Sequence, residues 1–224
     1  MLRSFILSLA LATGLGTTSV LAEDITLRMA TAAPPNTIWQ EQFDQFAADV
    51  AEETAGEVKI EIFYNAQLGG EHAVLPQVMR GRIDMGAFSV ASLTDQMSEA
   101  YFVSLLYFYD DLNVRSCVLD NISADFREMI APTGLHFMDW LEVGSGQLSG
   151  SKPFTTPDSV KGLRIGVAGN PLSNLYWEML DSYPVMTSSA DASSSISTGL
   201  VDVYPTIPVF YLFAGIAQVA PVIT

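Results

Sequence analysis

The stretch Lys161-Gly-Leu-Arg-Ile-Gly-Val-Ala-Gly-Asn-Pro171 decides the fold of its half of the chain. It predicts a short strand that runs into a tight turn. The residues from Pro171 onward, PLSNLYWEML, predict a helix with proline in its first turn, where a missing N–H is tolerated. A strand, a turn and a helix in this order present backbone donors and flanking side chains to a cleft. Gly166, at the centre of the strand, has no side chain, and this stretch alone does not tell which group occupies the space beside it.

Similar patterns on both sides of this stretch predict an α/β fold. Residues 25–30 and 57–63 alternate apolar and polar side chains, which is typical of strands with one buried face. We expect further strands at 82–88, 134–140, 183–186 and 200–204, and helices at 72–80, 122–131 and 171–180. Another helix is expected from a cap at Asn36 to about residue 54, and a short one in the Ser-rich segment that ends at Gly199. The repeated order βαβαβ indicates largely parallel sheets.

The N-terminus predicts a secretory signal peptide. One basic residue, Arg3, precedes an apolar run that ends at Ala22, a small residue suited to cleavage. Gly14 and Gly16 interrupt this run well short of a bilayer span, which disfavours a membrane anchor. We therefore expect residues 1–22 to be removed and the mature protein to be periplasmic, without direct membrane insertion.

Composition excludes several classes of function. The formal net charge of −15 disfavours nucleic acid and acidic lipid head groups as partners. Cys117 is the only cysteine, so no intramolecular disulfide forms, and we expect it to be a small buried side chain. His72 and His136 lack companions at zinc-ligand spacing. The serines of 188–195 have no visible base and are interpreted as helix caps and surface residues. We expect no enzyme activity, no metal and no cofactor.

Several stretches together resemble one family, the DctP-type periplasmic solute receptors of TRAP transporters. They occur in the family's order and cover nearly all of the chain beyond residue 22. The matching stretches are 58–63, 65–71, 77–86, 151–154, 156–165, 169–171 and 198–202.

The resemblance implies a two-lobe periplasmic-binding-protein-like fold with mostly parallel sheets and solute bound between the lobes. Lobe I is expected at 23–143 and lobe II at 144–224. The implied function is delivery of a small organic solute, usually a carboxylate, to the membrane permease subunits of a TRAP transporter.

Two departures from the family concern the charge of the solute. Two arginines that commonly bind the solute carboxylate are replaced by Gly146 and Gly166, and an asparagine aligns best with Thr206. Arg164 either compensates for the missing charge or is a solvated residue at the start of its strand; the second interpretation is favoured. The glycines also leave space for a bulkier solute or for an aromatic side chain such as Trp140.

Matched positions predict the solute site. The expected binding residues are Ala33, Asn36, Glu71, Phe88, Ser89, Trp140, Ser145, Gly146, Arg164, Gly166, Asn170, Tyr204 and Thr206. Each has a structural alternative: core packing for the aromatic residues, turn or cap roles for the asparagines, and solvation at a helix start for Glu71.

The family normally continues beyond the position of Thr224, so the second half is expected to be incomplete and to lack the segments that return to both lobes. The missing arginines and the early end leave two alternatives to a receptor for a carboxylate. One is a receptor for a neutral or cationic solute, and the other is a truncated, non-transporting relative or a sensor's ligand domain.

Overall fold

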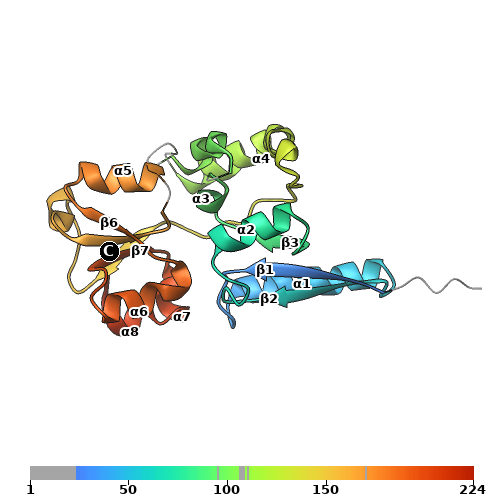
Figure 1. Cartoon of the computed structure of the whole chain (residues 1–224), viewed down its shortest axis with the longest axis horizontal. Coiled ribbons are helices and arrows are strands. Elements are labelled where there is room, and N and C mark those ends of the chain that lie inside the picture. The colour runs from blue at the N-terminus through green and yellow to red at the C-terminus, as the bar shows by residue number, and fades with distance from the viewer. Residues whose placement is uncertain (1–23, 95, 106–108, 110, 170) are drawn as a thin grey trace, which may run out of the picture.

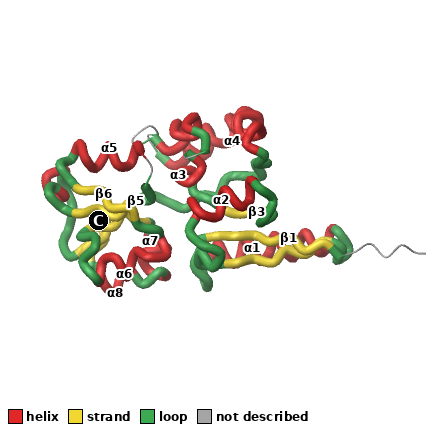
Figure 2. Tube along the Cα trace, in the orientation of Figure 1, coloured by secondary structure: helices red, strands yellow, loops and turns green. Residues whose placement is uncertain are grey.

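Two β-sheets, each with its own helices, organise the chain (Figures 1 and 2). The structure is a computed structural model that describes residues 24–224 except 95, 106–108, 110 and 170. The expected signal peptide, residues 1–22, lies outside the described residues. The first sheet has the strand order β2-β1-β3 and the second has the order β6-β5-β7-β4-β8. We call each sheet with its helices the first and the second sheet unit.

The first sheet is entirely parallel, as predicted. It consists of β1 (Ile25–Thr31), β2 (Val58–Phe63) and β3 (Met85–Ala87), and β1 pairs in parallel with both neighbours. Lys59 and Glu61 are exposed on β2 while the apolar residues between them are half-buried, which is the alternation that predicted this strand. The helices α1 (Ile38–Glu53), α2 (Glu71–Met79) and α3 (Val90–Leu93) follow the three strands in turn.

The cap of α1 was predicted one residue too early. The N-cap is Thr37, and Asn36 has a positive φ of 62°, which asparagine tolerates better than most residues. The Asn36 backbone N–H donates to the side-chain oxygen of Gln40 at 2.7 Å. We had predicted that the Asn36 side chain caps the backbone of the helix. Instead, the side chain of Gln40, within the first turn of the helix, accepts a hydrogen bond from the Asn36 backbone.

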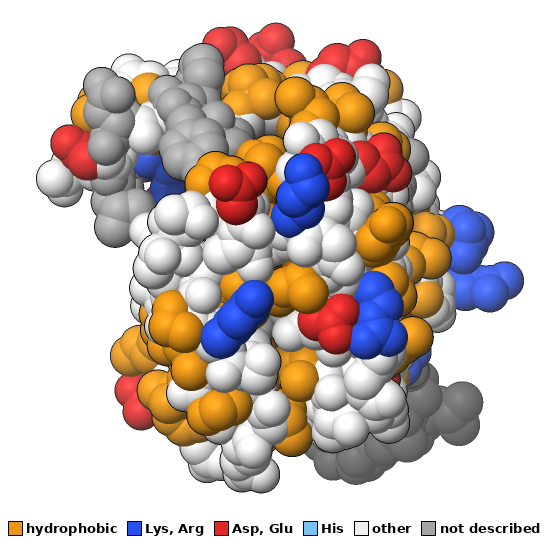
Figure 3. All heavy atoms as spheres, turned by 90° about the vertical axis from the view of Figure 1, so that its left-hand side faces the viewer, with side chains coloured by type: hydrophobic (Ala, Val, Ile, Leu, Met, Phe, Trp, Pro, Cys, Tyr) orange, Lys and Arg blue, Asp and Glu red, His pale blue; other side chains and the backbone are white. Residues whose placement is uncertain are grey.

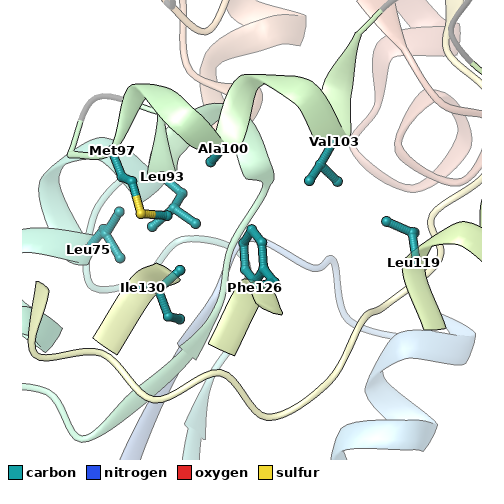
Figure 4. Close-up of a cluster of buried hydrophobic side chains, with 8 residues drawn as sticks. All are labelled: Leu75, Leu93, Met97, Ala100, Val103, Leu119, Phe126 and Ile130. Carbon is teal, nitrogen blue, oxygen red and sulfur yellow. The ribbon is translucent and has the colours of Figure 1, made fainter. Parts of the chain in front are cut away.

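A helical segment completes the first sheet unit. It comprises η1 (Ser98–Ser104), α4 (Leu112–Ile130) and η2 (Ala131–Thr133). The Asp111 carboxylate accepts hydrogen bonds from the N–H groups of Asn113 and Val114 at 2.7 and 2.9 Å. This cap explains why α4 begins ten residues before the predicted start at residue 122. Apolar side chains from α2, α3, η1 and α4 converge in one buried cluster (Figure 4).

The strand predicted at 134–140 is absent, because residues 135–146 have no regular structure. Packing and hydrogen bonds with α4 hold this segment instead of strand pairing. The ring centroids of Phe137 and Trp140 lie 5.1 and 4.6 Å from that of Phe126. The Arg127 guanidinium donates to the carbonyl oxygens of Phe137 and Met138, so a side chain takes the place of a neighbouring strand.

The second sheet is mixed. Its strands are β4 (Gln147–Gly150), β5 (Arg164–Val167), β6 (Tyr183–Met186), β7 (Val203–Thr206) and β8 (Val222–Ile223). The central strands β5, β6 and β7 are parallel, whereas β4 is antiparallel to both β7 and β8. The predicted α/β class with mostly parallel strands is confirmed.

Helices cover both faces of the second sheet (Figure 1). One face carries α5 (Pro171–Met179), whose Trp177 packs with Ile165 and Val203, and the short η3 (Pro157–Val160). The other face carries η4 (Ser189–Asp191), α6 (Ala192–Ser197), α7 (Pro208–Phe213) and α8 (Ile216–Val219). Tyr204 and Tyr211 belong to the apolar cluster on that second face. The adjacent β7 residues Val203 and Tyr204 therefore pack on opposite faces of the sheet, as expected for a pleated strand.

The outer face of the second sheet unit mixes apolar and charged side chains (Figure 3). Met179 on α5, and Tyr183 and Met186 on the edge strand β6, are exposed. Cys117, which we expected to be buried, is exposed on α4. Within residues 24–224, apart from the six positions that are not described, no helix combines the length and apolar character of a membrane span.

Candidate functional site

The two sheet units meet where parallel strands end. In Figure 1 the arrow of β1 points toward the second sheet unit. The rings of Trp39 on α1 and Phe210 on α7 lie 5.5 Å apart between centroids, and Trp39 is buried. The two units also approach each other at Gly70 of the first unit and Ser188 of the second. A Cβ placed on Gly70 would lie 3.7 Å from the Cβ of Ser188, which is an ordinary van der Waals contact. Because ligands of parallel α/β sheets gather at the carboxyl ends of the strands, this junction is the place to look for a site.

A hollow of about 270 Å³ opens on the second sheet unit beside this junction. This volume is just below the roughly 300–1,000 Å³ of pockets that hold drug-sized ligands, so it suits a smaller molecule. The hollow is lined by Gly146, Ser189, Tyr204, Pro205, Thr206, Ile207 and Phe210. Three of the predicted site residues, Gly146, Tyr204 and Thr206, are thus brought together by the fold.

Tyr204 occupies the space that Gly166 leaves. The two residues are neighbours on adjacent parallel strands, one position beyond the Ile165–Val203 pair. A Cβ on residue 166 would lie 2.4 Å from Cδ2 of the Tyr204 ring, closer than nonbonded carbon atoms approach. Glycine at this position therefore allows the ring to lie across β5. The alternatives for such space were a bulkier solute or an aromatic side chain such as Trp140; at Gly166 an aromatic side chain does fill it, and that side chain is Tyr204.

The Tyr204 phenol lies in a buried and negatively charged environment. Its side chain is only 8% exposed. Burial, together with the nearby negative charges of Glu71 and Asp191, raises the pKa of the Tyr204 phenol to about 12, because each of these effects disfavours the charged phenolate. Glu71 belongs to the first sheet unit, so its effect on Tyr204 acts across the junction. The phenol remains neutral at physiological pH.

Glu71, Phe88 and Ser89 form the opposing part of the junction. One Glu71 carboxylate oxygen accepts hydrogen bonds from the Ser89 N–H, at 3.1 Å, and from its hydroxyl. Glu71 and Phe88 line a recess of about 10 Å³, which has room for about one water molecule. The Phe88 ring covers Gly86, where a Cβ would lie 2.4 Å from it. These three predicted residues are therefore close together, but next to the hollow and not among its lining residues.

Other predicted residues have structural partners. The Ala33 N–H donates to the Thr31 hydroxyl at 3.1 Å, and its carbonyl accepts from the Asn65 N–H at 2.9 Å. Asn36 is exposed beside the start of α1. Ser145 is exposed next to Gly146, and Asn170 lies outside the described residues. For all four, a contact with solute stays a prediction.

Trp140 and Arg164 are engaged away from the hollow. The Trp140 indole N–H donates to the Leu119 carbonyl and to the Ser123 hydroxyl, at 3.1 and 2.8 Å, while its ring packs in the core beside α4. Arg164 donates two side-chain hydrogen bonds to Asp202, at 2.9 and 2.7 Å. This hydrogen-bonded pair lowers the pKa of the Asp202 carboxyl. Neither Trp140 nor Arg164 lines the hollow, so a role in solute binding stays a prediction for both.

Sequence reasoning expected the segment Tyr204–Thr206, which includes Pro205, but missed three other residues that line the hollow, namely Ser189, Ile207 and Phe210. Ile207 directly follows the predicted Thr206 at the end of β7, which was a usable signal. Ser189 lies in the serine run that we interpreted as caps, and its neighbour Ser188 does cap η4 by accepting from the Asp191 N–H. Phe210 lies two residues after Pro208 on α7, a helix for which no sequence signal was recognised.

Two α/β units meet at strand ends beside a hollow that has room for a small molecule. Residues 29–224 match the family of bacterial extracellular solute-binding proteins, family 7 (DctP), and the chain belongs to this family.

Similar proteins and structures are solute-binding proteins. A solute-binding protein of Chromohalobacter salexigens is 26% identical over 174 residues, which cover 75% of this chain and 51% of that protein. The 2,3-diketo-L-gulonate-binding periplasmic protein of Escherichia coli is 25% identical, over 67% of this chain and 47% of that protein. A TRAP periplasmic solute-binding protein from Sulfitobacter, crystallised with β-D-galacturonate, superposes with a TM-score of 0.84 at 23% identity, over 87% and 66% of the two chains. The chain thus spans about half the length of these curated relatives.

Proposed function

We propose that this chain is a receptor that binds a small organic solute between two lobes and delivers it to the membrane permease of a TRAP-type transporter. The single observation that carries the proposal is the hollow lined by Tyr204, Thr206 and Phe210, which lies against the first sheet unit. The first and second sheet units are proposed to be the lobes, with the boundary near residue 144. Membership of the family supports a periplasmic location after removal of the signal peptide.

The chemistry of the hollow supports binding over catalysis. Its lining supplies hydroxyl groups from Ser189, Tyr204 and Thr206, two aromatic rings and backbone groups. No histidine, lysine or carboxylate is among the described residues that line it, so none of these hydroxyls has a general base there. Such a set of groups orients a ligand through hydrogen bonds and apolar contact.

The solute class is tested by thermal unfolding of the chain with a panel of hexuronates, dicarboxylates, neutral polyols and organic ammonium compounds. A solute that binds only the native state at 100 times its Kd stabilises that state by about 2.7 kcal/mol. For a chain of this size, that corresponds to a rise in Tm of roughly 5–10 °C. We expect at least one class to give a saturable rise. A Tm that no member of the panel changes would contradict the receptor function.

A further inference from the structure

We propose that the hollow receives an organic cation, such as a small ammonium compound, with the rings of Tyr204 and Phe210 beside its charge and the Glu71 carboxylate facing it. This inference rests on the proposed receptor function and names the class of solute. It differs from the carboxylates and uronates bound by the crystallised proteins similar in fold, which include β-D-galacturonate and succinate.

The cationic side chains of the protein lie elsewhere. Of the ten lysines and arginines, all except Arg3 are within the described residues, and none of those lines the hollow or the recess beside it. Several are engaged with carboxylates, as in the pairs Lys161–Asp181 and Arg164–Asp202. A carboxylate solute in the hollow would therefore lose hydration without gaining the opposite charge that normally compensates for it.

Negative charge surrounds the hollow. A Cβ on Gly70, the residue before Glu71, would lie 3.7 Å from the Cβ of Ser188, the residue before Ser189 of the lining. Glu71 and Asp191 both act electrostatically on the Tyr204 phenol. The Asp191 carboxylate accepts from the Ser188 hydroxyl at 2.6 Å, and the Glu71 carboxylate accepts from Ser89. Both partners are uncharged serine groups, so neither carboxylate is paired with a cation in these hydrogen bonds. Glu71 is half-buried, whereas Asp191 is exposed and its field is more strongly screened by solvent; both charges attract a cation and repel an anion.

The aromatic residues supply the second element of cation recognition. Tyr204 and Phe210 both line the hollow, and Tyr204 is fixed in place by its packing over Gly166. An ammonium group over an aromatic face is attracted by the negative face of the ring, and this attraction grows when the group is desolvated. A quaternary ammonium also needs no hydrogen-bond acceptor, which suits a lining rich in apolar groups.

The test uses calorimetric titration of the chain with choline, with its uncharged isostere 3,3-dimethyl-1-butanol, and with D-glucuronate. We expect choline to bind at least tenfold more tightly than the alcohol, and D-glucuronate to give no measurable binding. Equal affinity for choline and the alcohol would overturn the cation proposal, as would tight binding of D-glucuronate. In both of these cases the receptor function would stand. Absence of binding by all three would also overturn the cation proposal, and the wider solute panel then decides the receptor function separately.

Two substitutions at Gly146 provide a matched pair of variants. A Cβ at this position meets no atom within 4 Å, so a longer side chain has room at the rim of the hollow. Gly146→Arg introduces a positive charge and is expected to weaken choline binding at least tenfold. Gly146→Gln has a similar reach without the charge and is expected to weaken choline binding clearly less than Gly146→Arg does. If both variants weakened choline binding equally, the size of the new side chain and not its charge would be the cause. This result would contradict the proposal.

Discussion

Replacing Gly166 with alanine is expected to lower the free energy of unfolding by about 1–3 kcal/mol, because one added methyl group overpacks the face of β5 that Tyr204 covers. The added Cβ would lie 2.4 Å from the ring, and the ring is buried between the sheet and the helices of its second face. Room for it is obtained only by moving Tyr204 or separating the strands. Chemical denaturation followed by circular dichroism measures the change.

The control for Gly166→Ala is Gly146→Ala, which adds the same methyl group to a position with no atom within 4 Å. We expect this control to stay within about 0.5 kcal/mol of the parent chain. In a Tyr204→Ala background, the cost of Gly166→Ala should fall to a similarly small value, since the ring is then gone. An unchanged cost in that background would show that Tyr204 is not the reason for glycine at residue 166.

Replacing Phe126 with alanine is expected to destabilise the chain by about 3–5 kcal/mol, the largest effect predicted here. Phe126 is 3% exposed and contacts the rings of Phe137 and Trp140, which hold the segment after η2 against α4. The substitution removes a buried ring and leaves a cavity that the surrounding helices only partly fill. Urea denaturation with tryptophan fluorescence follows it directly, because Trp140 lies in the same cluster.

The matched control for Phe126→Ala is Met138→Ala, in the same segment but 55% exposed. We expect it to change the free energy of unfolding by no more than about 0.5 kcal/mol. A similar loss for the two variants would mean that residues 135–146 are held by contacts other than the aromatic cluster.

The sequence predicted those elements whose pattern is local. The alternation of residues 57–63 and the apolar positions of the helix after residue 36 located β2 and α1. The strand predicted at 134–140 was wrong, because its apolar residues instead pack an extended segment with aromatic side chains on a helix, without pairing as a strand. The start of α4 was missed because Asp111, its cap, was not recognised as a start signal.

The site was predictable only in part, for reasons of geometry. Gly166 was recognised as a position that leaves space, but the residue that fills this space depends on the pairing of β5 with β7, nearly 40 residues later in the chain. A single sequence does not specify that register. Trp140 was a reasonable aromatic candidate, yet the indole N–H found its partners on α4 instead. The charge beside the hollow likewise depends on Glu71, which belongs to the other sheet unit and acts electrostatically on Tyr204.

The central claim is that solute binds between the two sheet units and contacts both. Amide hydrogen exchange of the chain, with and without the solute that most raises its Tm, tests this claim most directly. We predict that solute slows exchange both at residues 204–210 of the hollow and at residues 70–75 and 89–90 of the first sheet unit. Protection confined to one unit, or located away from the junction, would contradict the account.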